Sequence, residues 1–303
     1  MSDGPIAQVP ASGGATLAFS TLACPEWTAS RAVSAAVEFG YDAIEWRGGD
    51  EGHVRTSWSQ ARRARLRREM ADQGVAALCV TTYTSFLSPD AASQLRNRTH
   101  LERHIDLARD LGAPFVRAFA GIREDDAPES ELRRRVAGEL ALASEAARDA
   151  SVVIAIEQHD DFDRASQVAE ILELLPDAPV GAIWDVANGW AAGESPADGF
   201  ARIGDRLSYA QLKDGRGGRL DWNPTDFGQG TVPLGPAVEL LIRESRAPIC
   251  VEWIRAWAPE LAPPEVALPA LREYVLGLIN AAAVEQPRSP AFGAGRAAQG
   301  QPG

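Results

Sequence analysis

Short apolar runs alternate with amphipathic segments along most of the chain. The apolar runs lie at residues 17–22, 42–46, 76–82, 114–120, 151–157, 180–185, 207–213 and 248–253. They are too short for buried helices and have little polar alternation, which is typical of parallel strands covered on both faces. The pattern therefore predicts eight β-strands.

The segments between the runs carry helix signals. One begins at Thr28, a candidate N-cap, and ends at Gly40; another covers residues 98–112 and ends in glycine. Longer amphipathic segments lie at 129–150, 235–245 and 264–283. Strands and helices in strict alternation predict an α/β fold.

Eight such units over residues 15–283 predict a single-domain (β/α)₈ TIM barrel. The main alternative is a pair of dinucleotide-binding domains. That alternative requires a glycine-rich phosphate loop after an early strand, and neither G-x-G-x-x-G nor G-x-x-x-x-G-K-[ST] occurs in the sequence. The flanking residues 1–14 and 284–303 are rich in Gly, Ser, Pro and Ala, and we expect both to be disordered.

The amino-acid composition narrows the classes of molecule that the protein is expected to bind. The net charge is −12 and the pI is about 4.9, which argues against nucleic acid or an anionic membrane surface as partner. No apolar run approaches the roughly 20 residues that span a bilayer, and the first residues do not resemble a signal peptide. We expect a cytoplasmic protein that acts on a small molecule. Its three separated cysteines are expected to be reduced and buried.

Polar residues gather at the ends of the last four predicted strands. These are Glu157, Asp185, Gln211 with Lys213, and Glu252. In TIM barrels the carboxyl ends of the strands meet at one mouth, where the chemistry takes place. Carboxylates that converge there repel one another, and a divalent cation would remove the repulsion. Oxygen ligands favour Mn²⁺ or Mg²⁺, with Co²⁺ as a further candidate.

Because side chains alternate between the two faces of a strand, a second polar side chain is expected above Glu157 and another above Gln211. Side chains at i and i+2 share a face, so His159 is expected beside Glu157, and Lys213 beside Gln211. A histidine can exchange protons near neutral pH, and a lysine can hold an anionic oxygen.

Arginines and aromatic residues near the same strand ends complete the candidate site. Arg47, Arg117, Arg216 and Arg219 could anchor a carboxylate or phosphate, although ion pairs within the protein are the alternative for each. The aromatic residues could wall a pocket around a sugar or an aromatic substrate, and they leave room for a substrate less polar than a simple sugar.

Together, Glu157, Asp185, the stretch Gln211-Leu-Lys213-Asp214 and Glu252 resemble the xylose isomerase-like barrels, a broad group of sugar isomerases and epimerases. Four further stretches support the resemblance: AVEFGYDAIEWRG, ARDLGAPFVRAFAG, WDVANGWAAGESP and DFGQGTVPLGPAVELL. The resemblance extends over roughly residues 16–282. The endonuclease branch of this group needs many histidines, and this chain has four.

The resemblance implies that Glu157, Asp185, Gln211 and Glu252 hold a divalent metal. Gln211 departs from the commonest pattern, which has histidine there, and this favours Mn²⁺, Mg²⁺ or Co²⁺ over zinc. A second departure is Asn188, which stands where epimerases of this group often have a substrate-binding histidine. Homo-oligomers are common in the group, and nothing in the sequence points to a particular interface.

The chemistry implied is proton abstraction next to a carbonyl, with the enediolate stabilised by the metal. Glu157 and Glu252 would exchange the proton in an isomerase or epimerase. The alternative is a dehydratase of the dehydroshikimate type, in which His159 or Lys213 would take the proton. A third reading is a barrel that binds a ligand without catalysis.

Overall fold

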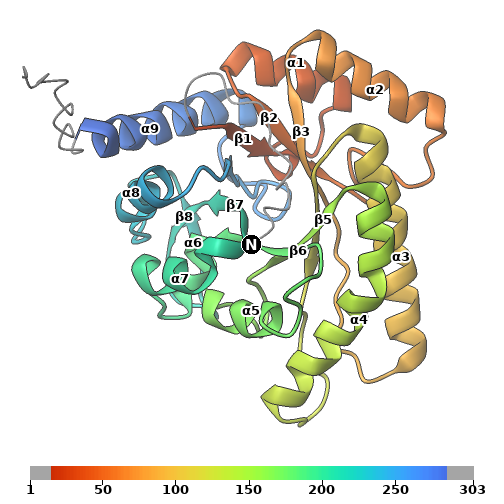
Figure 1. The fold of residues 1–303 in the computed structure, drawn as a ribbon. Coiled ribbons are helices and arrows are strands. Elements are labelled where there is room, and N and C mark those ends of the chain that lie inside the picture. Colours follow the sequence, from red (N-terminus) through yellow and green to blue (C-terminus); the bar gives the residue numbers. More distant parts are fainter. Residues whose placement is uncertain (1–14, 285–303) are drawn as a thin grey trace, which may run out of the picture.

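The computed structural model describes residues 15–284, in which eight parallel strands close into a barrel (Figure 1). Around the barrel the strands follow the order β1-β10-β7-β6-β5-β4-β3-β2. They are β1 (Leu17–Ser20), β2 (Ala43–Arg47), β3 (Ala76–Thr81), β4 (Phe115–Phe119), β5 (Val153–Glu157), β6 (Val180–Asp185), β7 (Leu207–Leu212) and β10 (Ile249–Val251). The predicted TIM barrel is confirmed. The disorder expected for residues 1–14 and 284–303 lies outside the described residues, apart from Val284.

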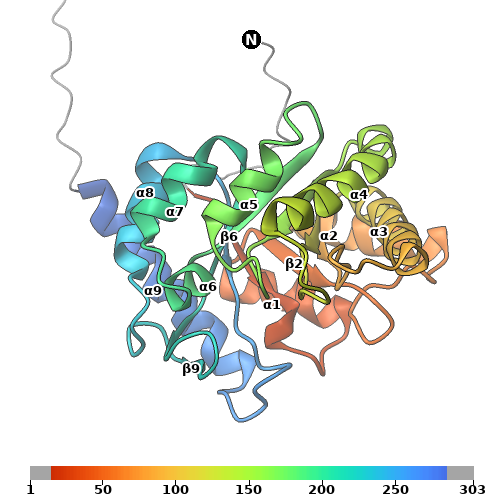
Figure 2. The ribbon, with the colours of Figure 1, turned by 90° about the horizontal axis from the view of Figure 1, so that it is seen from below.

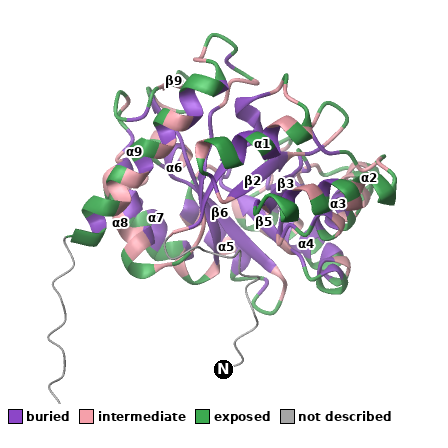
Figure 3. Ribbon diagram, turned by 90° about the horizontal axis from the view of Figure 1, so that it is seen from above, coloured by how far each residue is buried: buried purple, intermediate pink, exposed green. Residues whose placement is uncertain are grey.

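Helices surround the strands and bury one face against them (Figure 3). They are α1 (Ala29–Phe39), α2 (Gln60–Asp72), α3 (Ala91–Leu111), α4 (Glu129–Ala150), α5 (Ala165–Leu172), α6 (Val186–Ala191), α7 (Pro196–Ile203), α8 (Leu234–Glu244) and α9 (Pro264–Val284). Short 3₁₀ turns, η1 (Thr21–Ala23) and η2 (Gly204–Arg206), follow β1 and α7. The helix caps expected for α1 are present: the Thr28 hydroxyl accepts a hydrogen bond from the Arg31 amide, and Gly40 has a φ of 78°.

The C-terminal helix α9 is long and apolar but packs against the barrel. Among the helices of residues 15–284, α9 has the length and composition of a membrane span. Arg272 and Glu273 interrupt its apolar residues, so it contains no uninterrupted apolar run of about 20 residues. In the structure, however, Leu268, Leu271 and Val275 of α9 are buried in the protein core, so the helix has a structural role in the barrel wall.

The barrel interior contains a distinct apolar layer. Its members are Ala18, Ala43, Leu78, Cys79, Phe115, Ala155, Ile183, Tyr209 and Cys250. A separate and larger core lies between the strands and the helices. Small side chains such as Ala18 and Ala155 lie among large ones such as Phe115 and Tyr209, and together they close the centre of the barrel below the mouth.

A two-stranded hairpin extends the mouth of the barrel after β7. Its strands, β8 (Asp214–Arg216) and β9 (Asn223–Thr225), pair antiparallel, and β9 lies at one end of the barrel near α6 (Figure 2). The buried Asp214 carboxylate accepts hydrogen bonds from the backbone amides of Gly228 (2.8 Å) and Gly230 (3.0 Å), among others. This single carboxylate therefore fixes the loop that follows the hairpin.

Substituting Gly230 by alanine tests the role of this loop. A Cβ at Gly230 would lie 2.0 Å from Asp214 Oδ1, so the carboxylate or the loop must move. We expect Gly230→Ala to lower the free energy of unfolding by about 1–3 kcal/mol, as measured by urea denaturation. The matched control is Gly138→Ala in α4, where nothing lies within 4 Å of the new Cβ; stability should rise there by about 0.5–1 kcal/mol. Equal effects at the two glycines would contradict the proposed role.

Candidate active site

A ring of buried polar residues lies one step above the apolar layer. Each barrel strand has an apolar residue that points into the barrel. A buried polar residue lies two positions after it, in the strand or directly after its end. These are Ser20, Glu45, Thr81, Arg117, Glu157, Asp185, Gln211 and Glu252. The period of two along a strand explains why all eight share one depth. The predicted convergence of Glu157, Asp185, Gln211 and Glu252 is thus present, and Glu45 and Arg117 lie in the same ring.

Glu45 is a fully buried member of this ring that the sequence reading did not single out. Its Oε2 accepts hydrogen bonds from the Tyr209 hydroxyl and from Gln211 Nε2, the latter at 2.9 Å. Burial raises the pKa of Glu45 above its usual range. The available signal was a charged residue inside the apolar run 42–46, which is uncommon for a strand covered on both faces.

Lys213 connects two strand ends. Its Nζ donates to Asp185 and also to Glu252, where the distance to Oε2 is 2.8 Å. Although burial opposes its charged form, the carboxylates of Asp185 and Glu252 hold the pKa of Lys213 above its usual value. Burial also opposes the ionised form of Glu252, but the Lys213 ammonium prevails and holds the pKa of that carboxyl below its usual range. Both groups are therefore charged at neutral pH.

Arg117 pairs with Glu157 inside the barrel. Arg117 Nη1 donates to Glu157 Oε2 at 2.7 Å, and Nη2 donates to the Thr82 carbonyl at 3.4 Å. Burial raises the pKa of Glu157 to about 7, against the opposing effect of Arg117. Glu157 and Glu252 thus lie in environments that shift their pKa values in opposite directions, a property of proton-exchanging pairs.

His159 is oriented by its neighbours. Its Nδ1 donates to Asp160 Oδ1 at 2.9 Å, and its ring packs on Phe119 with a centroid distance of 4.7 Å. Burial opposes the charged ring, but the hydrogen bond to Asp160 and the negative charge of Glu157 raise the pKa of His159. With Nδ1 engaged, Nε2 is the nitrogen free to exchange a proton with a ligand. Asp160 is therefore the residue that orients the ring.

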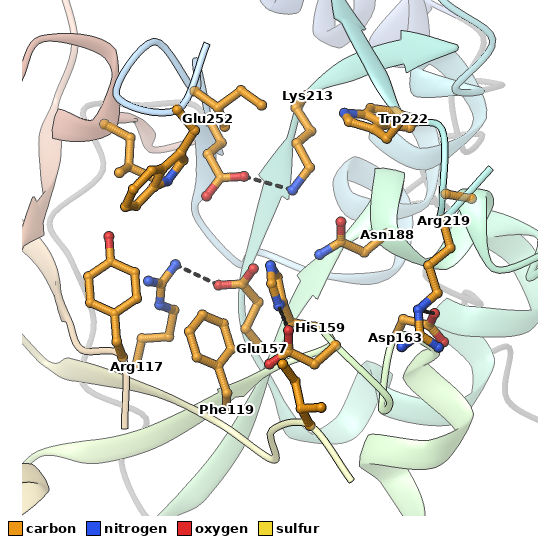
Figure 4. Close-up of a pocket in the computed structure, with 17 residues that line it drawn as sticks. Arg117, Phe119, Glu157, His159, Asp163, Asn188, Lys213, Arg219, Trp222 and Glu252 are labelled. Carbon is orange, nitrogen blue, oxygen red and sulfur yellow. Dashed lines mark hydrogen bonds and ion pairs between the residues drawn. The ribbon is translucent and has the colours of Figure 1, made fainter. Parts of the chain in front are cut away.

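These groups surround a cavity of about 670 Å³ at the barrel mouth (Figure 4). The expected site residues that line it are Arg117, Glu157, His159, Asn188, Lys213, Arg219 and Glu252. Asp185 and Gln211 are fully buried next to it and contact its lining through Lys213 and Glu252.

The remaining candidate arginines have partners within the protein. Arg47 donates from Nε to the Tyr83 hydroxyl at 3.1 Å and does not line the cavity. Arg216 donates to the Gln229 carbonyl and lies outside it. Arg219 does line the cavity, but it forms an ion pair with Asp161 and a second contact with Asp163 at 3.5 Å. All four candidate arginines, Arg117 included, therefore have partners within the protein.

Two observations indicate that the oxygen ligands of the ring suit a divalent cation. Gln211 Oε1 is buried and has no hydrogen-bond partner. The four carboxyl groups of the ring also outnumber the two cations that contact them, Arg117 in the ring and Lys213 directly above it. Across residues 15–284, however, no three His, Cys, Asp or Glu side chains are arranged to hold a metal ion. Lys213 lies between Asp185 and Glu252, so a metal would have to take its place.

Comparison with known proteins agrees with this architecture. The sequence profile described as "Xylose isomerase-like TIM barrel" matches residues 33–274. No curated protein matches the chain. Three solved structures illustrate the similarity in fold. The IolI protein with a bound zinc atom has a TM-score of 0.75 and 19% identity, and the match covers 88% of this chain and 98% of that one. For L-ribulose 3-epimerase the TM-score is 0.75 and the identity 16%, with 91% of this chain and 100% of that one covered. For the probable 3-DHS dehydratase AsbF from Bacillus anthracis the TM-score is 0.70 and the identity 15%, with 86% of this chain and 98% of that one covered.

The orientation of His159 by Asp160 can be tested by NMR. We expect Asp160→Asn to lower the pKa of His159, because the substitution removes the negative charge that favours the imidazolium. The measurement is a pH titration of the ring protons, which is tractable because the chain has four histidines. His159→Gln provides the assignment. An unchanged pKa in Asp160→Asn would show that Asp160 does not hold the ring.

Proposed function

Because this chain belongs to the xylose isomerase-like TIM barrel family, we propose that it is a divalent-metal-dependent isomerase or epimerase of sugars or sugar-like ketoses. The observation that supports this most directly is the pair Glu157 and Glu252. Both line one cavity, and each presents a buried carboxyl group to it. Such a pair can take a proton from a carbon next to a carbonyl and return one to it.

The residues that would hold the metal are Glu157, Asp185, Gln211 and Glu252. All four offer oxygen, which suits Mn²⁺ best, with Mg²⁺ or Co²⁺ as alternatives. When bound, the metal would supply positive charge beside substrate oxygens on which negative charge grows as the proton leaves.

The protein's own residues would then carry the proton. Glu252 and Glu157 both face the cavity, and the carboxylate of either could accept it. Asn188 Nδ2 donates to the Gln158 carbonyl at 2.8 Å, which fixes its amide at the cavity edge for hydrogen bonding to a substrate hydroxyl. The buried floor and aromatic rim would exclude water from the reacting carbon.

A dehydratase is the second candidate, and one observation favours it. His159 has an orienting carboxylate in Asp160 and leaves Nε2 unengaged, which is the arrangement of a general base or acid. His159 would remove the proton next to the carbonyl, and it or Lys213 would protonate the departing hydroxyl group. The two candidates therefore differ in which residue is essential.

Metal binding is the first test. We expect the purified, chelator-treated protein to bind one equivalent of Mn²⁺ in isothermal titration calorimetry. Glu157→Gln should weaken binding by at least about tenfold, because it removes a charged ligand. Glu173→Gln, on the exposed end of α5, is the matched control and should bind as the parent does. Absence of stoichiometric Mn²⁺ binding by the parent protein would refute the metal site.

Isotope exchange separates the two candidate reactions. In D₂O, an isomerase or epimerase should place deuterium next to the carbonyl of a ketose from a panel such as fructose, tagatose, psicose and ribulose. Glu252→Gln should slow this exchange by about 10²–10⁴-fold, and His159→Gln by less. Loss of water from dehydroshikimate, abolished by His159→Gln, would instead establish the dehydratase.

A further inference from the structure

The residues directly above the polar ring divide the cavity into two chemical halves. On the side of β5, β6 and β7 the lining is polar and consists of His159, Asn188 and Lys213. On the side of β10, β1, β3 and β4 it is apolar and consists of Ile254, Leu22, Tyr83 and Phe119. The strand period places most of these residues two positions beyond the ring, so the division lies at a single depth.

The apolar half continues outward to the rim. Trp257 packs edge-on against Tyr83 with a centroid distance of 6.1 Å, and Tyr83 lies 6.5 Å from Phe119. Ile122 completes this wall. Tyr83 is 46% exposed, Trp257 58% and Ile122 64%, so three large apolar side chains face solvent at one cavity. A contiguous apolar surface of this kind at the mouth of a pocket indicates a binding surface.

Arg47 stabilises this wall from outside the cavity. Its guanidinium lies 5.0 Å from the Trp257 ring centroid, and its Nε donates to the Tyr83 hydroxyl. Both rings are therefore oriented before a ligand arrives, which lowers the entropic cost of binding.

Trp222 forms the opposite side. Figure 4 shows it across the cavity from Phe119. Its ring packs on the backbone of Gly215, where a Cβ would lie 2.4 Å from Trp222 Cζ2. A side chain at Gly215 would therefore displace the indole. The cavity mouth thus lies between aromatic residues, while the charged groups are confined to its floor and one side.

We propose that the substrate carries a planar apolar group, such as an aromatic ring, next to a hydroxylated reacting part that bears the carbonyl group. The inference rests on the proposed function, because it places the reacting part at Glu157 and Glu252. The hydroxylated part would lie on the polar side near His159 and Asn188. The planar group would lie in the mouth against Trp257, Tyr83 and Ile122.

The energetics of binding favour this substrate over a simple sugar. A simple sugar bound at Glu157 and Glu252 could pack a C–H face on one of the rings, but it would leave the rim residues Trp257 and Ile122 exposed to water. A planar apolar substituent would bury the exposed rings and gain aromatic packing in addition.

A matched pair of ligands tests the proposal by calorimetry on the full chain loaded with Mn²⁺. Phenyl β-D-glucopyranoside and methyl β-D-glucopyranoside share the sugar and differ in the planar group. We expect the phenyl glycoside to bind at least about tenfold more tightly. Trp257→Ala should remove this preference while leaving the affinity for the methyl glycoside unchanged. Trp190→Ala is the control, because Trp190 is also partly exposed but lies outside this cavity.

Each remaining outcome is decisive. Equal affinities for the two glycosides, no binding of either, or a preference that persists in Trp257→Ala would overturn the inference. The deuterium-exchange assay with small ketoses reports on the proposed function separately. Exchange without a phenyl preference would keep the function and discard the substrate class, whereas a phenyl preference without exchange or water loss would count against the function.

Discussion

Four carboxyl groups lie in one buried layer of the barrel, and their mutual repulsion is the constraint to which the rest of the site responds. In a medium of low dielectric constant, such a set is stable only if each group is paired, hydrogen-bonded or neutral. Arg117 pairs with Glu157, Lys213 bridges Asp185 and Glu252, and Tyr209 and Gln211 donate to Glu45. Removing either of the two cations would therefore leave buried negative charge unpaired.

The same network would link the proposed metal binding to the residues proposed to act on the substrate. Lys213 lies between two of the expected ligands, so a metal would enter only as the ammonium leaves Asp185 and Glu252. A released Lys213 would lie beside the cavity that it already lines, with its charge available to a substrate oxygen. Gln211 would change its contacts in a similar way. Its Nε2 donates to carboxylates, whereas its Oε1, the atom that could bind a metal, has no hydrogen-bond partner. To keep the charges of the ring balanced, metal binding, the release of Lys213 and the change at Gln211 would therefore have to occur together.

The sequence predicted the barrel because its strongest signal is local: eight apolar runs at strand length, separated by helical segments. Elements with weak local signals were not anticipated. Helix α2 is rich in arginine and buries little besides Leu66 and Met70, so its apolar face is narrow. Helices α5, α6 and α7 are short, and the β8–β9 hairpin depends on the Asp214 carboxylate rather than on its own pattern. These elements form because the barrel offers them contacts, which no short window of sequence reveals.

The site shows the same division between local and non-local information. Glu157, Asp185, Gln211 and Glu252 could be placed together from strand ends alone, since the carboxyl ends of parallel strands meet. Their pairing could not, because it depends on contacts between distant strands, such as that between Gln211 and Glu45. The apolar half of the cavity was the hardest feature to predict. Leu22, Phe119 and Ile254 resemble ordinary core residues in the sequence, and only the position of their strands shows that they face a cavity. Under the proposed function, the ring of charged residues would determine which reactions are feasible, and the layer above it would determine which molecules reach that ring.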